Sequence, residues 1–247
     1  MSNSLPLANK VAVITGAGRG IGKAIALAYA GAGAAICCAA RTQAEIAQTA
    51  AEIVAAGGRA VAVQTDVRDA QAVDRLMAQA AAQLGGIDIV VINAGVNLDR
   101  RPVMESELDD WRATVEINLF GAYYCAKAAI PHLRTRGAGK IIIVGSGMGH
   151  RGSAGYSAYC VSKAGVWMLT QVLAQEVWQD TISVNELIPG PVQTAIDQNV
   201  PARADAPFAA SSEWSKQPED VAPLALFLAT QPDVGPTAQS FSLMRRA

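Results

Sequence analysis

A tyrosine and a lysine four residues apart, Tyr159 and Lys163, are the side chains of this sequence best suited to proton transfer. Residues at i and i+4 lie one above the other on a helix, so a helix here would place the phenol beside the ammonium. A phenol titrates near ~10 in water, and a neighbouring positive charge lowers its pKa. A tyrosine with a lowered pKa can act as a general acid or base. The alternative is an amphipathic helix with a half-buried tyrosine and a solvated lysine.

The residues that precede this pair distinguish it from a second pair with the same spacing, Tyr123 and Lys127. Ser146 stands 13 residues before Tyr159 and directly follows the apolar run 140–144, which predicts a buried strand. A serine at the end of a strand can donate a hydrogen bond to a carbonyl oxygen that a tyrosine protonates, although it could also be an ordinary turn residue. No serine holds the corresponding place before Tyr123. The ordered set favours Tyr159.

A glycine-rich segment at 16–22 joins the apolar, β-branched run 10–15 to a helical stretch at 23–30. Strand, glycine loop and helix in this order predict a phosphate-binding turn, because glycines let the backbone approach a ligand and a helix N-terminus attracts a phosphate. An ordinary tight turn is the alternative. The spacing is T-G-x-x-x-G-x-G, with Thr15, Gly16, Gly20 and Gly22, whereas the usual G-x-G-x-x-G would need its third glycine at Ile21.

With this loop and the ordered set around Tyr159, the sequence resembles the short-chain dehydrogenase/reductase family over residues 9–243. The resemblance implies hydride transfer between a nicotinamide cofactor and a carbonyl or secondary alcohol. It implies that Tyr159 moves the substrate proton, that Lys163 lowers the phenol's pKa and binds the nicotinamide ribose, and that Ser146 orients the carbonyl. Asn118, inside an apolar helical stretch at 115–129, would support a water in a proton relay. A buried structural asparagine is the alternative.

The end of the second predicted strand, 34–40, bears on the choice between NADP and NAD. An acidic residue there accepts hydrogen bonds from the ribose 2′-hydroxyl of NAD, but this sequence has Ala40 followed by Arg41. Arg41, together with Arg19 in the glycine loop, could pair with the 2′-phosphate of NADP. We therefore expect NADP as the cofactor. The alternatives are that Arg41 solvates a helix start, or that the enzyme is an NAD-dependent polyol or sugar dehydrogenase.

The resemblance extends the predicted cofactor site to other strand ends. Asp66 and Val67 follow the strand 59–65 and would contact the adenine, although Asp66 could equally cap the next helix. Asn93-Ala94-Gly95 follows the strand 87–92, with Ile92 where the family usually has another asparagine. The family's P-G-x-V-x-T segment beside the nicotinamide follows the strand 181–187. The predicted cofactor residues are Gly16, Arg19, Gly20, Ile21, Gly22, Arg41, Asp66, Val67, Asn93, Ala94, Gly95, Tyr159, Lys163, Pro189, Gly190, Val192 and Thr194.

Strands alternate with helices along the whole chain, with further helices expected at 44–56, 70–84 and 218–229 and a last strand at 237–243. This alternation predicts an α/β fold, a single doubly wound, Rossmann-like domain over residues 1–247 whose mostly parallel sheet is flanked by helices. Residues 194–217 have little periodicity and predict a substrate lid. The C-terminal FSLMRRA departs from the family's usual ending, which leaves the subunit contacts there open.

Composition bounds the remaining possibilities. The chain is 51% hydrophobic and 17% charged with a net charge of −1, which favours a large core and argues against nucleic-acid or anionic-membrane partners. Its four cysteines, Cys37, Cys38, Cys125 and Cys160, and two histidines have no metal-ligand spacing, so we expect no metal site and a reducing compartment. The N-terminus lacks the regions of a signal peptide, so we expect a cytoplasmic location. The resemblance implies a homodimer or homotetramer.

The substrate is left open by the sequence. We expect the pocket to include residues near Val96, Met148, His150, Tyr156 and 195–214, and Arg100, Arg101 or Arg151 could bind an acidic group. A 3-oxoacyl thioester, a sugar and a small ketone are all compatible. A hypothesis of another class is a nucleotide-binding sensor or scaffold without catalysis, which would not need the ordered set around Tyr159.

Overall fold

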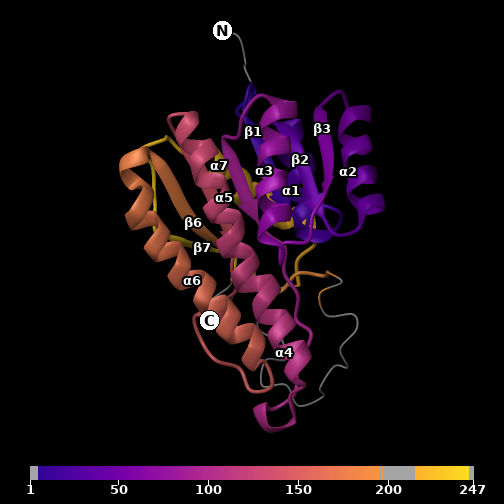
Figure 1. Ribbon diagram of the computed structural model, residues 1–247, viewed down its shortest axis with the longest axis vertical. Helices are drawn as coiled ribbons and strands as arrows, with labels where there is room; N and C mark the ends of the chain where they lie inside the picture. The colour runs from indigo at the N-terminus through magenta and orange to yellow at the C-terminus, as the bar shows by residue number, and fades with distance from the viewer. Residues whose placement is uncertain (1–4, 195, 197–214, 245–247) are drawn as a thin grey trace.

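The computed structural model describes residues 5–194, 196 and 215–244 (Figure 1). Its centre is a seven-stranded sheet in the order β3-β2-β1-β4-β5-β6-β7, and every pairing between neighbours is parallel. The strands are β1 (Val11–Thr15), β2 (Ala35–Ala40), β3 (Arg59–Gln64), β4 (Ile89–Ile92), β5 (Gly139–Val144), β6 (Ile182–Ile188) and β7 (Ser240–Ser242). The predicted α/β fold with its parallel sheet is confirmed.

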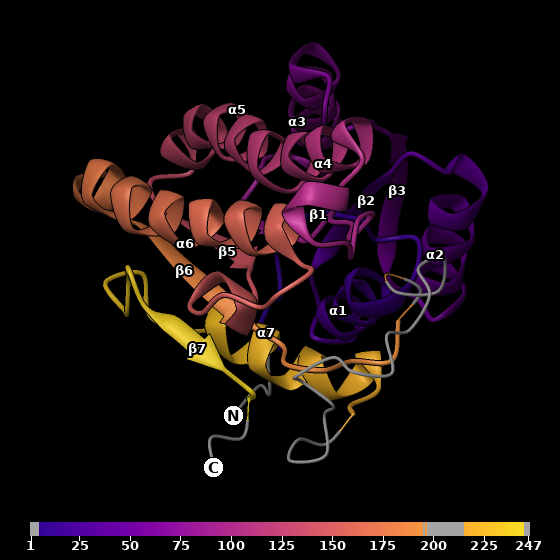
Figure 2. The ribbon, with the colours of Figure 1, turned by 90° about the horizontal axis from the view of Figure 1, so that it is seen from below.

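Helices cover both faces of the sheet (Figure 2). They are α1 (Gly20–Gly31), α2 (Gln43–Ala55), α3 (Ala70–Leu84), α4 (Leu108–Val115), α5 (Gly121–Thr135), α6 (Ser157–Val177) and α7 (Ala222–Ala229). One apolar core lies between the sheet and α3, α5 and α6, and the other lies between the sheet and α1, α2 and α7. The central strands are continuous apolar runs because each must fill both cores.

Cys37 and Cys38 illustrate how neighbouring strand residues divide between the two cores. Cys37 packs into the core under α3 and α5, and Cys38 packs into the core under α1 and α7. Burial raises the pKa of both thiols to about 12. Both thiols are free, as is that of Cys125. They therefore serve as small core side chains.

The strand order reverses beside β1, which pairs with β2 on one side and β4 on the other. In open α/β sheets this reversal opens a crevice at the carboxyl ends of the strands. Thr15 links the end of β1 to the segment after β4, because its hydroxyl oxygen accepts hydrogen bonds from the backbone N–H groups of Asn93 and Ala94, each at 3.0 Å. In return the Asn93 side-chain amide donates to the Thr15 carbonyl at 2.9 Å.

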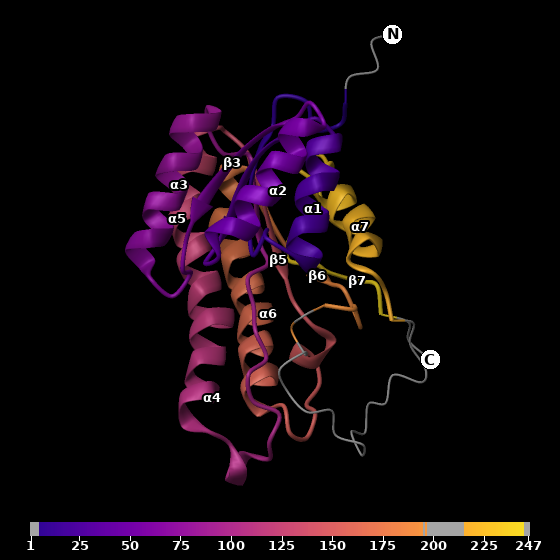
Figure 3. The ribbon, with the colours of Figure 1, turned by 90° about the vertical axis from the view of Figure 1, so that its right-hand side faces the viewer.

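The helix predicted at 115–129 is part of a longer helical run. This run begins at Leu108 with α4 and extends to Thr135 at the end of α5. Between α4 and α5 the residues Glu116–Phe120 form a π-helical turn. The wider turn shifts the angular position of the side chains, so the two halves do not share one apolar stripe. Figure 3 shows α4 and the start of α6 extending together beyond the sheet.

The remaining differences concern element ends and the lid. The predicted helix 218–229 opens with a 3-10 turn, Pro218–Val221, before α7, and β7 is shorter than the predicted strand 237–243. The predicted lid, 194–217, lies for its greater part outside the described residues. Where the chain enters and leaves this segment, Val192 and Lys216 form a parallel bridge.

The described residues also bear on two other kinds of site, a membrane span and a metal centre. None of the helices there combines the length and apolarity needed to cross a membrane. Over the same part of the chain, no three side chains of His, Cys, Asp or Glu gather into a group that could hold a metal ion.

Candidate active site

A pocket at the carboxyl edge of the sheet brings most of the predicted site residues together. It lies where the loops after β4, β5 and β6 meet the N-terminal parts of α1 and α6. The predicted site residues that line it are Ile21, Asn93, Gly95, Ser146, Tyr159, Lys163, Pro189, Gly190, Val192 and Thr194. These residues from three strand ends and two helices therefore converge on one cavity.

Ser146 and Tyr159 both line the pocket, and the Ser146 side chain acts to lower the pKa of Tyr159. Ser146 stands at the end of β5 and caps the 3-10 turn Gly147–Gly149, since its hydroxyl oxygen accepts from the Met148 N–H at 3.2 Å. Tyr159 lies in the first turn of α6. The two residues are thus brought to one cavity, and their roles toward a substrate stay predictions.

Lys163 is buried at 5% exposure, and its ammonium donates to the Val144 carbonyl at 2.7 Å. Burial lowers the pKa of Lys163 to about 8, and the Glu186 carboxylate acts in the opposite direction. The ammonium lies 5.8 Å from the centre of the Tyr159 ring. The pair on one helical face is therefore formed as expected.

The prediction that Lys163 lowers the pKa of Tyr159 is wrong for this structure. The pKa of Tyr159 is raised, because desolvation by the surrounding protein outweighs the effect of the Ser146 side chain. The positive charge that acts to lower the pKa belongs to Arg100. Lys163 instead directs its ammonium at the backbone of β5.

Asn118 is buried at 2% exposure within the π-helical turn, and its side-chain amide is hydrogen-bonded to other residues of the protein. Its oxygen accepts from the Val96 N–H at 2.8 Å, while its nitrogen donates to the Val96 carbonyl at 2.9 Å and to the Ser162 hydroxyl at 3.0 Å. These bonds join the loop after β4 to α6. They favour the structural alternative for Asn118, and its part in a proton relay stays a prediction.

The glycine loop has the shape of a phosphate cradle. Gly16 and Gly20 have φ angles of +68° and +54°, which glycine adopts without strain. A Cβ atom on Gly22 would collide with the Gly16 carbonyl, so the loop must fold back directly onto α1. Arg19, at the N-cap of α1, makes no side-chain capping bond. The Arg19 side chain thus does not cap the first N–H groups of α1, and the loop fits the pyrophosphate of a dinucleotide.

The residues predicted at the adenine end lie on the neighbouring strand ends. Arg41 follows β2 and is exposed, with its carbonyl accepting from the Gln64 side chain at 2.8 Å. Asp66 is ion-paired with Arg68 at 2.6 Å, and this pairing holds the pKa of Asp66 below its usual range. The alternative that Asp66 caps α3 is wrong, because Asp69 is the N-cap. Val67 is buried in the core.

Comparison with known proteins identifies the family. Residues 10–205 match the sequence model of the short chain dehydrogenase family. The chain belongs to the short-chain dehydrogenase/reductase family. Its relatives include a 3-oxoacyl-[acyl-carrier-protein] reductase of Synechocystis sp., 36% identical over 96% of each chain, and a cis-4-hydroxycyclohexanecarboxylate dehydrogenase of Sinomonas cyclohexanicum, 38% identical over 90% of each. A crystal structure of a short-chain type dehydrogenase/reductase from Mycobacterium marinum superposes with a TM-score of 0.88 at 34% identity, covering 97% of this chain and 96% of that chain.

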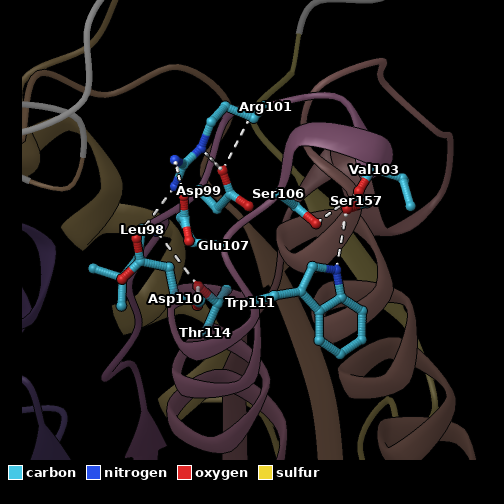
Figure 4. Close-up of polar contacts among 10 residues, drawn as sticks. All are labelled: Leu98, Asp99, Arg101, Val103, Ser106, Glu107, Asp110, Trp111, Thr114 and Ser157. Carbon is cyan, nitrogen blue, oxygen red and sulfur yellow. Dashed lines mark hydrogen bonds and ion pairs between the residues drawn. The ribbon is translucent and has the colours of Figure 1, made fainter.

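Among the three arginines considered for the substrate end of this short-chain dehydrogenase/reductase, Arg101 does not line the pocket. It pairs with Asp99 at 2.8 Å, Glu107 at 3.1 Å and Asp110 at 3.4 Å, as Figure 4 shows. This network fixes the segment that leads into α4, so the hypothesis of a substrate role for Arg101 is not supported.

Trp111, in α4 itself, is hydrogen-bonded to α6: its indole N–H donates to the Ser157 hydroxyl at 3.1 Å (Figure 4). The arginines that do line the pocket are Arg100, whose guanidinium lies 5.7 Å from the centre of the Tyr156 ring, and Arg151. Met148 and Tyr156 line it as expected, whereas Val96 and His150 lie outside its lining.

The sequence reasoning missed Glu186, which is completely buried in β6. One carboxylate oxygen pairs with the His150 ring at 2.8 Å and accepts from the Ser240 hydroxyl at 2.5 Å. The available signal was a glutamate in the middle of an apolar strand, where an acid is almost never fully buried unless it is paired. Glu186 also explains Gly145, because a Cβ atom there would collide with the carboxylate.

This collision can be measured as a stability effect. We expect Gly145→Ala to lower the free energy of unfolding by about 1–3 kcal/mol through overpacking. Urea denaturation would measure it, with Gly152→Ala as the control, since nothing lies within 4 Å of a Cβ atom there. In a double-mutant cycle, Gly145→Ala combined with Glu186→Ala should cost less than the two single losses added together. Simple additivity would show that the two residues do not compete for the same space.

Proposed function

We propose that this protein is an NADP(H)-dependent oxidoreductase that interconverts a carbonyl compound and a secondary alcohol. The observation that carries the proposal is that Ser146, Tyr159 and Lys163 line one pocket together with the segments after β4 and β6. The bound nicotinamide would supply or accept the hydride. The protein supplies the position of the reacting groups and the proton.

Each side chain has a distinct part in this proposal. In the reductive direction Tyr159 gives its phenolic proton to the carbonyl oxygen, and in the oxidative direction the phenolate takes that proton back. Ser146 orients the oxygen by donating a second hydrogen bond. Lys163 contributes a positive charge to the pocket and binds the nicotinamide ribose. The glycine loop would hold the pyrophosphate.

The chain has further groups suited to hold a nicotinamide dinucleotide. We assign the pyrophosphate to Gly16, Gly20, Ile21 and Gly22, and the nicotinamide to the segment that contains Pro189, Gly190, Val192 and Thr194. Asn93, Ala94 and Gly95, with Asp66 and Val67, complete the proposed cofactor residues. A Cβ atom on Gly20 would lie 3.4 Å from a methyl group of Thr194, so the two segments meet across the pocket.

The preference for NADP over NAD rests on the end of β2. Ala40 provides no carboxylate for a ribose 2′-hydroxyl, and the exposed guanidinium of Arg41 follows it directly. One observation favours the alternative, an NAD-dependent dehydrogenase. The carboxylate of Glu45 lies against the glycine loop, since a Cβ atom on Gly18 would be 2.9 Å from one of its oxygens. A negative charge beside the glycine loop opposes a 2′-phosphate, so Arg41 has to offset it.

Substitution of Arg41 tests this preference. We expect Arg41→Asp to weaken NADP binding at least tenfold and to leave NAD binding equal or tighter, because an aspartate repels the 2′-phosphate and accepts hydrogen bonds from a 2′-hydroxyl. Fluorescence titration with NADPH and NADH would measure the two dissociation constants. Arg59→Asp is the matched control, since Arg59 is exposed at the opposite end of the neighbouring strand. Unchanged NADP affinity in Arg41→Asp would contradict the assignment.

Turnover separates an enzyme from a sensor or scaffold. We expect NADPH-dependent reduction, or the reverse oxidation, with at least one compound class from the names of the relatives: 3-oxoacyl thioesters, cis-4-hydroxycyclohexanecarboxylate or meso-2,3-butanediol. Arg100 and Arg151 in the pocket favour a substrate with a negative charge. Tight dinucleotide binding without hydride transfer to any of these would support the sensor. Cytoplasmic location and assembly into a homodimer or homotetramer stay predictions.

A further inference from the structure

A buried carboxylate lies behind the proposed catalytic residues, and three elements hold it in place. Glu186 in β6 is 0% exposed, which is unusual for a carboxylate unless its charge is compensated. One of its oxygens is bound by His150 and Ser240. Within the described part of the chain its other oxygen, Oε1, has no hydrogen-bond partner. The charge of Glu186 therefore needs a partner besides these two bonds.

His150 is itself held by α6, the helix that carries Lys163. Its ring lies 5.0 Å from the Trp167 ring, centre to centre. The turn just before it packs directly on the helix, because a Cβ atom on Gly149 would lie 2.7 Å from the backbone carbonyl of Lys163. Since a carboxylate can only accept, His150 donates its Nε2 hydrogen to Glu186 at 2.8 Å. Turn, helix and strand thus form one packed unit around the carboxylate.

The lysine side chain reaches into the same unit from the pocket. Its ammonium donates to the carbonyl of Val144, and Val144 pairs in register with Leu187, the residue after Glu186. Gly145, the next residue of that chain segment, lies directly against the carboxylate. Lys163 and Glu186 consequently meet across the ends of two paired strands. Each is a buried charge within electrostatic reach of the other.

We propose that Glu186 is the counter-ion of Lys163 and keeps this lysine protonated, with His150 and Ser240 fixing the position of the carboxylate. In this role Glu186 is a positioning residue, since it acts on the proposed chemistry only through Lys163. Its effect on turnover rests on the proposed function, whereas its effect on the charge of Lys163 does not.

Electrostatics gives the direction of the effect. A buried ammonium loses the stabilisation of water, which favours its neutral form, and an anion close by favours the charged form. The charged or titratable groups around the pair are His150 from the turn after β5, Tyr159 from α6, and Arg100 and Arg151 from the pocket lining. Of these groups, the arginines are cations and oppose the charge of Lys163. Glu186 is the group whose charge favours protonation of the lysine.

The first test measures the charge of Lys163 directly and needs no substrate. The protein is labelled with 13C at lysine Cε, the Lys163 resonance is assigned with Lys163→Arg, and its chemical shift is followed against pH. We expect Glu186→Gln, which has the same shape without the charge, to lower the titration midpoint of Lys163 by about 1 pH unit or more. An unchanged midpoint would overturn the proposal.

Two variants separate charge from structure. Ser240→Ala removes one hydrogen bond to the carboxylate and keeps its charge, so the midpoint should stay within a few tenths of a pH unit. If Glu186→Gln does not fold, Glu186→Met removes the charge with a side chain of similar length, and the same decrease is expected. A midpoint that falls as far in Ser240→Ala as in Glu186→Gln would assign the effect to packing and overturn the proposal.

The second test uses turnover, with the rate followed as a function of pH. In Glu186→Gln the alkaline limb of kcat should move to lower pH together with the lysine midpoint. Wild-type protein that titrates as expected but turns over no compound contradicts only the proposed function. Wild-type protein with turnover whose Glu186→Gln variant keeps both the lysine midpoint and the alkaline limb contradicts only the role of Glu186.

Discussion

Tyr159→Phe is expected to lose nearly all turnover and to keep its affinity for the dinucleotide. The substitution removes the phenolic O–H that would move the substrate proton, and a positioned general acid contributes about 10²–10⁴-fold to the rate. The ring stays in place on α6, so the packing of the pocket is retained. Ser146 remains in the pocket, so the variant tests the phenolic hydroxyl alone.

The measurement combines steady-state turnover with a separate titration of dinucleotide binding. Tyr123→Phe is the matched control, because Tyr123 stands four residues before Lys127 on α5 and is 43% exposed, outside the pocket lining. It should change kcat by less than twofold. If Tyr159→Phe retained more than about a tenth of the wild-type rate, the role of general acid would have to be assigned to another group.

Gly22→Ala is expected to abolish dinucleotide binding and to destabilise the fold. A Cβ atom at this position would collide with the Gly16 carbonyl and lie 2.5 Å from the Asn93 side-chain nitrogen. Both contacts belong to the crevice beside β1, so neither can yield without opening the phosphate cradle. We expect at least a hundredfold loss of affinity, measured by fluorescence titration, and a free energy of unfolding lower by about 1–3 kcal/mol, measured in urea.

Gly31 provides the control on the same helix. It closes α1, and nothing lies within 4 Å of a Cβ atom placed there. Gly31→Ala should leave dinucleotide binding unchanged and stabilise the protein by up to about 1 kcal/mol, because alanine loses less backbone entropy than glycine in a helix. Equal affinity losses in both variants would show that α1, and not the cradle, governs binding.

The sheet and the lining of the pocket could be predicted because both depend on local sequence. Apolar, β-branched runs such as 10–15 are typical of strands buried on both faces, and parallel strands bring their carboxyl ends to one edge. Ser146 and Tyr159 were placed correctly for this reason, since one ends a strand and the other opens the helix after it. The glycine spacing likewise specifies a turn whose geometry depends only on neighbouring residues.

The electrostatics of the site could not be predicted, because they depend on residues distant in sequence. The charges that act on Tyr159 and Lys163 belong to Arg100 and Glu186, which no spacing within α6 reveals. The cap of α3 is open from the sequence for a different reason, since Asp66 and Asp69 are both suitable acids. In the structure Asp69 accepts from the N–H groups of Gln71 and Ala72, whereas Asp66 pairs with Arg68.

The π-helical turn between α4 and α5 has a consequence for the phase of the helical run. A π-turn holds one residue more than the corresponding α-helical turn, and one residue of an α-helix corresponds to a rotation of about 100°. If all the residues of 116–120 continued as a regular α-helix, the extra residue would rotate the faces of α4 and α5 relative to each other. Either Asn118 would turn away from Val96, or Trp111 would leave Ser157. The π-helical turn therefore takes up the extra residue and lets both contacts form at once.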